Sequence, residues 1–262
     1  GIQFVIAIIL ARLLSPAEYG LVSIIMIFIT IANVVVQNGF STALVQKKHS
    51  DDTDFSSVFY FSLAIAAVMY AALYASAPSI AGFYHNDVLV PIVRVLAVVL
   101  FPGAVISVQT AYVSRKMEFK GLFKATMVAV VISGAASILM ALRGMGVWAM
   151  VGQQIAYYLA LMTTLFMTVS WKPRLVFAMG RISAMFSFGW KLLLAALLDT
   201  LFNNLYGLIM GKIYNEELLG AYNRGDQFPK LIVNNLGAAI QAVLLPAFSS
   251  RQGDVAQVRS MV

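Results

Sequence analysis

The chain has 262 residues, of which 61% are hydrophobic and 11% are charged, and its formal net charge is +7. Soluble domains carry about 25% charged residues, so this composition excludes an ordinary soluble domain and predicts an integral membrane protein. The chain contains no cysteine, which excludes disulfides, thiolate nucleophiles and cysteine-bound metals within these residues.

Apolar windows of about 20 residues, the length that crosses a hydrocarbon layer of about 30 Å, follow one another along the chain. They lie at 21–44, 55–80, 88–112, 122–142, 145–170, 184–211 and 229–249, and Gly1 to Ala11 is similar to the end of one more. Runs of this length cross a membrane as helices, because a helix satisfies its backbone hydrogen bonds internally. Since the chain begins without Met and with half a span, we expect it to be a fragment.

Lysine and arginine are concentrated in alternate connections between the predicted spans. The connections after the second, fourth, sixth and eighth spans hold twelve of the eighteen basic residues, namely Lys47, Lys48, Arg115, Lys116, Lys120, Lys124, Lys172, Arg174, Arg181, Lys191, Arg251 and Arg259. The positive-inside rule therefore predicts that the even-numbered connections are cytoplasmic. It places the hinge at 13–20 and an acidic loop at 213–228 on the outer side. The net positive charge is then explained by the orientation of the chain in the membrane. We therefore expect no nucleic-acid partner.

Two stretches on the predicted outer side are similar at an offset of 200 residues. Arg12 aligns with Lys212, and Gly20 aligns with Gly220. The stretches lie six spans apart, and an even number of spans preserves orientation, so they indicate parallel six-helix halves of the kind found in transporters. Alternatively, the similarity reflects only the common use of glycine and acidic caps in turns between helices.

The predicted fold is therefore an all-α, polytopic transmembrane bundle containing one six-helix lobe and the first two helices of a second lobe. The first lobe comprises residues 1–170, with an incomplete first span. A cytoplasmic amphipathic linker is expected at 171–183, because this stretch mixes charged and large apolar residues. Residues 184–262 then begin the second lobe.

Four stretches of the sequence together resemble one known family. They are "ARLLSPAEYGLVSI" (11–24), "QNGFSTALVQKKHSDDTDFSSVFYF" (37–61), "VSRKMEFKGLF" (113–123) and "LGAYNRGDQFPKLIVNNLGAAIQAVLLPAFSSRQGD" (219–254). They are similar to the polysaccharide-type flippases, which serve lipopolysaccharide and exopolysaccharide export, of the multidrug/oligosaccharidyl-lipid/polysaccharide exporter superfamily. The resemblance implies two six-helix lobes in the bacterial inner membrane that move undecaprenyl-pyrophosphate-linked oligosaccharide to the outer leaflet by alternating access. It implies no enzymatic activity and no cofactor; the implied partners are the lipid-linked substrate, membrane lipids and glycan-assembly proteins.

Two other functions stay open. A multidrug-type cation exporter of the same superfamily would be expected to line its cavity with unpaired acids. Asp199 is the one acid predicted inside the spans, whereas two cations, Arg94 and Lys191, are predicted there. This balance favours an anionic cargo. A polytopic glycan polymerase or transferase would need a sizeable outer loop or clustered acid and base groups, and no connection is long enough to build a catalytic subdomain.

Charged side chains inside the spans are the first candidates for substrate binding, because a charge at mid-membrane costs roughly 2.5–3.5 kcal/mol on insertion scales. In the seventh span Asp199 and Asn203 lie one turn apart on one face, and Lys191 lies about two turns earlier. Lys191 could meet the anionic cargo or extend to the membrane surface, and Asp199 could take up a proton or bond a neighbouring helix. Arg94 could bind the diphosphate with its planar fork or extend outward.

Amide side chains inside three spans are further candidates for contact with the substrate. Asn33 and Gln37 share a face of the second span, and Gln153 shares a face of the sixth with Tyr157. Asn234 and Gln241 share a face of the eighth span. Such amides bind substrate or join neighbouring helices by hydrogen bonds.

One short motif is similar to a metal site of soluble enzymes. Asp52-Thr53-Asp54 has the D-x-D spacing with which some glycosyltransferases hold a metal. It immediately precedes a helix, whose first turn needs oxygen acceptors, so we interpret it as a helix cap. His49 and His85 match no metal-binding motif, and we expect no metal site.

Overall fold

The computed structural model describes residues 2–47, 50–214 and 216–226. These residues form helices and contain no strand, which confirms an all-α bundle. The elements are α1 (Ile2–Leu13), α2 (Pro16–Gln46), α3 (Asp52–Tyr84), α4 (Leu89–Leu96), the short 3-10 helix η1 (Ala97–Val99), α5 (Leu100–Lys116), α6 (Phe119–Leu142), α7 (Val147–Thr168) and α8 (Met179–Ile213). The chain separates into two compact units, Gly1–Gly220 and Ala221–Val262, and every contact described below lies within the first.

Each predicted span up to residue 211 lies on one helix, except that the span at 88–112 is divided among α4, η1 and α5. Among the described residues, α2, α3, the α4–α5 segment, α6 and α8 are long and apolar enough to cross a membrane. The prediction of a loop over 213–228 is wrong, because residues 216–226 are helical. The acidic residues of this stretch are compatible with a loop, but acidic residues also stabilise the first turn of a helix. The predicted eighth span lies outside the described residues.

The polar breaks between the apolar runs are helix starts. Ser15 caps α2: its hydroxyl accepts the backbone N–H of Glu18 at 3.3 Å, and the Glu18 carboxylate accepts the Ser15 N–H at 2.7 Å. Pro16 follows at the first helical position, where its missing N–H costs nothing. Asp51 and Asp54 form the same capping box at the start of α3, so the prediction that the D-x-D motif belongs to a helix cap is confirmed.

The fourth predicted span is interrupted by η1. Pro102, in the first turn of α5, has no N–H to donate to the carbonyl four residues earlier, and that carbonyl belongs to Val98 within η1. The missing hydrogen bond explains why the α-helix gives way to 3-10 geometry at this point. The apolar face of the segment stays buried across the break, with Leu96, Ala97 and Leu100 fully enclosed.

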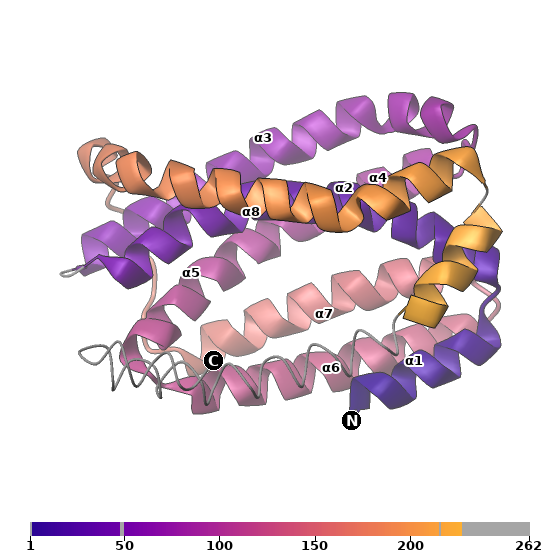
Figure 1. Ribbon diagram of the computed structural model, residues 1–262. Coiled ribbons are helices and arrows are strands. Elements are labelled where there is room, and N and C mark those ends of the chain that lie inside the picture. Colours follow the sequence, from indigo (N-terminus) through magenta and orange to yellow (C-terminus); the bar gives the residue numbers. More distant parts are fainter. Residues whose placement is uncertain (1, 48–49, 215, 227–262) are drawn as a thin grey trace, which may run out of the picture. The chain divides into compact units, whose positions relative to one another are not determined.

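Helix α8 lies along α2 (Figure 1), and glycines on α8 let the two helices approach closely. A Cβ atom on Gly207 would lie 3.0 Å from Cδ1 of Ile27, and one on Gly211 would lie 3.2 Å from Cγ1 of Ile24. The two glycines are four residues apart, which is the small-xxx-small spacing of membrane helix interfaces. The first helix of the predicted second lobe is therefore packed directly on the first lobe.

A reciprocal contact joins the start of α2 to the helical residues 216–220. A methyl group on Gly20 would overlap the carbonyl oxygen of Glu216, and one on Gly220 would overlap the carbonyl oxygen of Pro16. An offset of 200 residues relates Gly20 to Gly220 and Pro16 to Glu216, so the two contacts exchange equivalent residues, which is the pattern that a local two-fold axis produces. The predicted repeat of six-helix lobes and the linker at 171–183 stay predictions.

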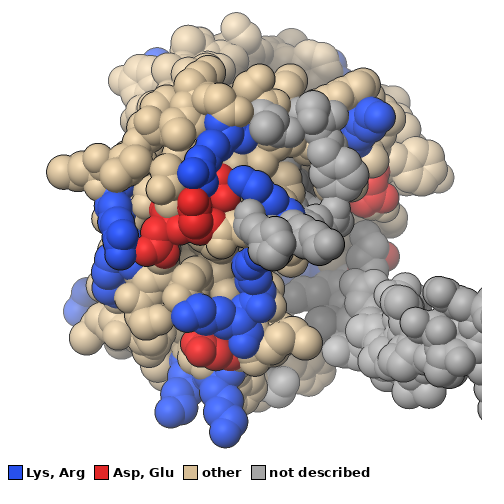
Figure 2. Space-filling model, turned by 90° about the vertical axis from the view of Figure 1, so that its left-hand side faces the viewer, with Lys and Arg blue, Asp and Glu red and all other residues tan. Residues whose placement is uncertain are grey.

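The connections between helices gather at two opposite ends of the bundle (Figure 1). At one end, α2, α5 and α7 finish and α3, α6 and α8 begin. Figure 2 views this end and shows lysine and arginine side chains around a group of acids. We call it the basic end. Its described cations from the predicted cytoplasmic connections, apart from Lys191 further along α8, are Lys47, Arg115, Lys116, Lys120, Lys124, Lys172, Arg174 and Arg181. That this end faces the cytoplasm stays a prediction.

Candidate functional site

A polar groove of about 330 Å³ runs between α2 and α5, in the half of the bundle nearer the basic end. Its described lining residues carry hydroxyl, amide or apolar side chains and no charge, and they are Gln37, Ser41, Val45, Ile106, Ser107, Thr110, Ala111 and Ser114. The hydroxyl oxygens of Ser41 and Ser107 lie 2.9 Å apart and join the two helices. An uncharged surface of this kind offers hydrogen bonds to a polar but neutral ligand.

An amide cluster lies next to the groove and is joined to it by Gln37. The Gln37 amide donates to Oδ1 of Asn33 at 2.8 Å, and the Asn33 amide donates to the Tyr158 hydroxyl of α7 at 3.4 Å. Gly103 of α5 faces this pair, and a Cβ there would lie 3.0 Å from both amide side chains. The prediction that Asn33 and Gln37 share a face is confirmed. Gln153 is half-buried on α7, and its role stays a prediction.

Arg94 lies in a different pocket from these amides. This pocket, of about 500 Å³, is lined by Tyr70, Tyr74, Val90, Pro91, Arg94, Val95, Val98 and Ile155. The Arg94 guanidinium stands 4.2 Å from the centre of the Tyr74 ring, a cation–π contact. Its Nε atom is buried and has no hydrogen-bond partner among the described residues. The structure thus separates Arg94 from the amide cluster.

The predicted polar residues of α8 are exposed on its surface. Lys191, Asp199 and Asn203 all present accessible side chains, and within the described part of the chain neither charged residue forms an ion pair. Asn234 and Gln241 lie outside the described residues. The α8 residues are therefore available for a ligand, and their substrate-binding role stays a prediction.

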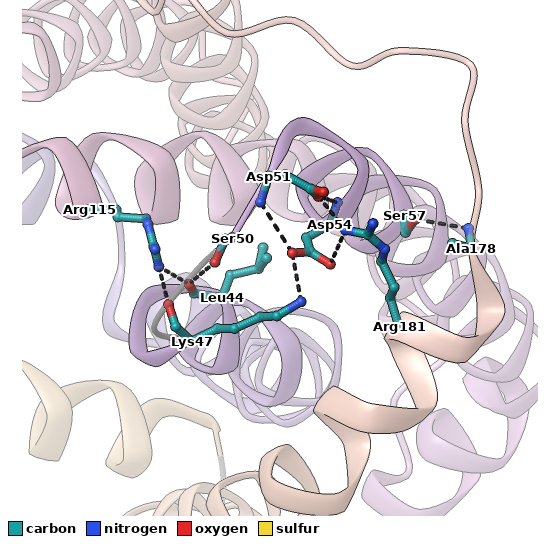
Figure 3. A network of polar contacts seen from close by, with 9 residues as sticks. All are labelled: Leu44, Lys47, Ser50, Asp51, Asp54, Ser57, Arg115, Ala178 and Arg181. Carbon is teal, nitrogen blue, oxygen red and sulfur yellow. Dashed lines mark hydrogen bonds and ion pairs between the residues drawn. The ribbon is translucent and has the colours of Figure 1, made fainter.

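A network of charges at the basic end connects α2, α3 and the start of α8 (Figure 3). Asp54 is at its centre: the side chain is 1% exposed and lies 2.7 Å from Lys47 and 3.1 Å from Arg181. Arg181 also pairs with Asp51. The buried Asp54 carboxylate thus binds two cations from distant parts of the chain: Lys47 at the end of α2 and Arg181 at the start of α8.

The segment before α8 is fixed along the start of α3 by further bonds. The backbone N–H of Arg174 donates to the Ser56 hydroxyl, and that of Ala178 donates to the Ser57 hydroxyl, both at 3.0 Å. The Arg174 side chain forms an exposed ion pair with Asp52 at 2.9 Å. The charge network and these backbone bonds together hold the connection between α7 and α8 against the bundle.

The network also changes the acidity of Asp51. The hydrogen bond from Arg181, reinforced by the backbone N–H of Asp54, lowers the pKa of Asp51 from 3.8 to about 2. The same hydrogen bonds to Asp51 and Asp54 raise the pKa of the Arg181 guanidinium. Asp51 and Arg181 are therefore held in their charged forms at neutral pH.

Several residues of these sites were not among those predicted from the sequence. Ser41, Ser107, Thr110 and Tyr158 carry hydroxyls, which are common in membrane helices and often bond to their own backbone. Ser107, for example, also donates to the carbonyl of Ala104 in its own helix. Only the packing of α2 against α5 and α7 distinguishes them from ordinary helix residues.

A bundle of long apolar helices with a groove that carries hydroxyl and amide groups and with a basic end defines a polytopic helical membrane protein. The family described as polysaccharide biosynthesis protein matches residues 9–262. The chain belongs to this family, which confirms the resemblance to polysaccharide-type flippases.

Curated relatives match almost the whole chain. The succinoglycan biosynthesis transport protein ExoT of Rhizobium meliloti (strain 1021) is 24% identical over 254 residues, covering 97% of this chain and 51% of the relative. The teichuronic acid biosynthesis protein TuaB of Bacillus subtilis (strain 168) is 27% identical over 232 residues, covering 87% and 48%. The lipopolysaccharide biosynthesis protein WzxC of Escherichia coli (strain K12) is 22% identical over 267 residues, covering 99% and 53%. The chain spans about half the length of these relatives. No solved structure matches it significantly.

Proposed function

We propose that the chain is part of a transporter that moves lipid-linked oligosaccharide or polysaccharide repeat units, carried on undecaprenyl pyrophosphate, from the inner to the outer leaflet by alternating access. The observation that carries the proposal is the uncharged polar groove between α2 and α5. The matching relatives support it, since ExoT is named as a biosynthesis transport protein for succinoglycan.

The groove fits the needs of a sugar that crosses a membrane. A hydroxyl group taken from water without a new partner costs about 1–3 kcal/mol, and one sugar unit carries several hydroxyls. Thr110 and Ser114 can replace some of those hydrogen bonds without adding a charge. Gln37, Ser41 and Ser107 already form hydrogen bonds within the bundle, and their remaining lone pairs can accept further ones. The groove therefore lowers the barrier for the glycan while leaving the charged diphosphate to other residues.

The diphosphate requires cations. Lys191 and Arg94 are the residues predicted for it from the sequence, and the proposal keeps Lys191, because Arg94 lines a pocket separate from the groove. Lys191 is exposed near the basic end, where an inward-open cavity would receive an anionic cargo. Asp199 and Asn203 follow on the same helix, and Asp199 is the proposed residue for ion coupling. Gln153, Asn234 and Gln241 complete the proposed set of substrate contacts.

The remaining features of the proposal follow from transport. The protein acts without a chemical step or a cofactor, lies in the bacterial inner membrane with its basic end in the cytoplasm, and works beside glycan-assembly proteins. A cation exporter fits less well, because Asp54, the buried acid among the described residues, is already paired with two cations. A glycan polymerase or transferase fits less well because the described connections between helices are short.

The test uses the full-length protein in a strain that lacks its gene. Lipid-linked glycan should accumulate on the inner leaflet of the deletion strain, and the wild-type gene should restore export. The double variant Thr110→Val/Ser114→Ala removes two partly exposed hydroxyls from the groove, each worth about 0.5–1.5 kcal/mol if it bonds the cargo. Export should then fall about tenfold or more at equal protein levels.

The matched control is Ser137→Ala. Ser137 is a fully buried serine of α6 that donates to the carbonyl of Gly134 in its own helix and does not line the groove. Its loss should leave export unchanged. Wild-type export by the groove variant, or an equal loss in the control, would overturn the groove as the glycan path. A deletion strain that exports glycan normally would overturn the transport function itself.

A further inference from the structure

We propose that the pocket between α3, α4 and α7 binds the phosphate of an anionic phospholipid from the surrounding membrane, with Arg94 as the cationic donor. The proposal concerns a structural lipid and goes beyond the transport of glycan. It rests on the depth of Arg94 in the bundle, on its unsatisfied donor and on the composition of the pocket.

The position of Arg94 matches the level of lipid phosphates. The segment Leu89–Lys116 has 28 residues, about 42 Å of helix, which equals the thickness of a bilayer including its headgroup layers. The hydrocarbon core takes about 30 Å of this, leaving about 6 Å for each headgroup layer. Arg94 follows Leu89 by five residues, about 7.5 Å along the axis. Its long side chain therefore reaches the boundary where phospholipid phosphates lie.

The guanidinium still lacks an anion. The Nε atom of Arg94 is buried without a hydrogen-bond partner among the described residues. The ring of Tyr74 contacts one face of the guanidinium. The described lining of the pocket contains no acid. A phosphate oxygen would satisfy the donor and the charge together, because charge-assisted hydrogen bonds from arginine to phosphate are among the strongest in proteins.

The rest of the pocket suits the apolar part of the same ligand. Val95 and Val98 are exposed on the apolar surface, and Val90 and Ile155 continue the wall. An acyl chain that runs along this wall from a phosphate at Arg94 would bury apolar surface of both the lipid and the protein. The described wall comes from α3, α4, η1 and α7, and therefore not from α2 and α5, which line the polar groove.

The charge count distinguishes a phospholipid from the transported cargo. One arginine neutralises the single negative charge of a phosphodiester such as phosphatidylglycerol. The diphosphate of a lipid-linked glycan carries at least two negative charges, and a single cation would leave one of them uncompensated beside an apolar wall. The observed pocket, with one cation, is therefore matched to a monoanionic lipid.

The experiment measures lipid binding to the purified full-length protein by native mass spectrometry, with phosphatidylglycerol, phosphatidylcholine and undecaprenyl diphosphate as separate probes. The wild type should bind phosphatidylglycerol about tenfold more tightly than phosphatidylcholine. The choline group of phosphatidylcholine already neutralises its phosphate, so the pairing with Arg94 is weaker. Arg94→Gln should reduce this preference to less than about twofold. Arg94→Lys should keep part of it, because lysine retains the charge but not the planar fork.

Two further variants separate the pocket from general effects of charge and folding. Val95→Trp fills the pocket while keeping Arg94, and it should also remove the preference. Arg143→Gln removes an exposed cation at the same end of the bundle, after α6, and should leave the preference intact. Unchanged phosphatidylglycerol binding in Arg94→Gln would overturn the proposal. An Arg94-dependent preference for undecaprenyl diphosphate would overturn it too, and would assign the pocket to the cargo.

Discussion

Asp54 should contribute far more to the stability of the basic end than its exposed neighbour Asp52. The Asp54 carboxylate is 1% exposed and lies 3.1 Å from Arg181, whereas Asp52 is 46% exposed and its partner Arg174 is 70% exposed. Both acids are in the first turn of α3, and both partners are in or near the connection that leads into α8. The two pairs differ in burial and in their further partners, since Asp54 also pairs with Lys47 and Arg181 also pairs with Asp51. The pair of Asp52 with Arg174 therefore serves as the exposed comparison.

The expected magnitudes follow from this difference in burial. At 3.1 Å and an effective dielectric constant of about 20, the gross attraction between Asp54 and Arg181 is about 5 kcal/mol. Desolvation offsets much of this, and Arg181 keeps 40% of its side chain exposed, so we expect a net coupling of about 1.5–2 kcal/mol. Exposed pairs such as Asp52 with Arg174 typically contribute about 0–1 kcal/mol.

A double-mutant cycle measures both couplings. Asp54→Asn keeps the shape of the side chain and an oxygen for the helix cap while removing the charge, and it is combined with Arg181→Gln. The control cycle combines Asp52→Asn with Arg174→Gln. Unfolding of the full-length protein is followed in mixed micelles. Equal couplings in the two cycles, or a coupling below about 0.5 kcal/mol for Asp54 with Arg181, would refute the central role of the buried carboxylate.

Three further predictions test the packing, topology and pH response. Gly20→Ala should destabilise the protein by about 1–3 kcal/mol, because the added methyl overlaps a backbone carbonyl of the neighbouring helix; Gly82→Ala, with nothing within 4 Å of its Cβ, should not, and equal unfolding midpoints would contradict this. In the cysteine-free background, an outer-side thiol reagent should label Ser15→Cys and spare Lys116→Cys in intact cells, and the reverse pattern would invert the topology. The pKa of Asp51 is lowered from 3.8 to about 2, so its contribution to stability is complete above pH 4 or so and is lost as the pH falls toward about 2. That contribution is at most about 1 kcal/mol because the carboxylate is exposed; Asp51→Asn should remove this part of the acid sensitivity, and an unchanged acid transition would count against it.

The helices could be predicted because hydrophobic length and capping residues are local signals. The apolar runs give the spans, and the D-x-D motif at Asp52 to Asp54 gives the start of α3. The start of α2 was predicted as part of a hinge at 13–20, although Ser15 and Glu18 have the spacing of a capping box. The extent of the last described helix was not predictable in the same way. Acidic residues after Tyr214 are compatible with both a loop and the first turn of a helix. In the structure these residues are helical, and the backbone of Glu216 packs against Gly20.

The sites depend on contacts between residues far apart in the sequence. Asp54 and Arg181 are separated by 127 positions, and the sequence pattern identified them separately as a helix cap and a topology signal. Asn33 was predicted as a polar position, but its partner Tyr158 on α7 is 125 positions away. Arg94 was predicted to bind phosphate, whereas the aromatic wall beside it becomes visible only once α3 packs on α4. Pairings of this kind are set by helix packing, which the periodicity of one helix does not determine.

The most direct test of the proposed transport uses the purified full-length protein in liposomes that contain a labelled lipid-linked oligosaccharide. A membrane-impermeant reagent that modifies sugars is added outside, and the fraction of glycan that becomes accessible is followed over time. We predict that liposomes with the wild-type protein expose nearly all the glycan, that protein-free liposomes expose about half, and that Thr110→Val/Ser114→Ala slows the exposure about tenfold. Exposure that stops at the protein-free level with the wild-type protein would contradict the account.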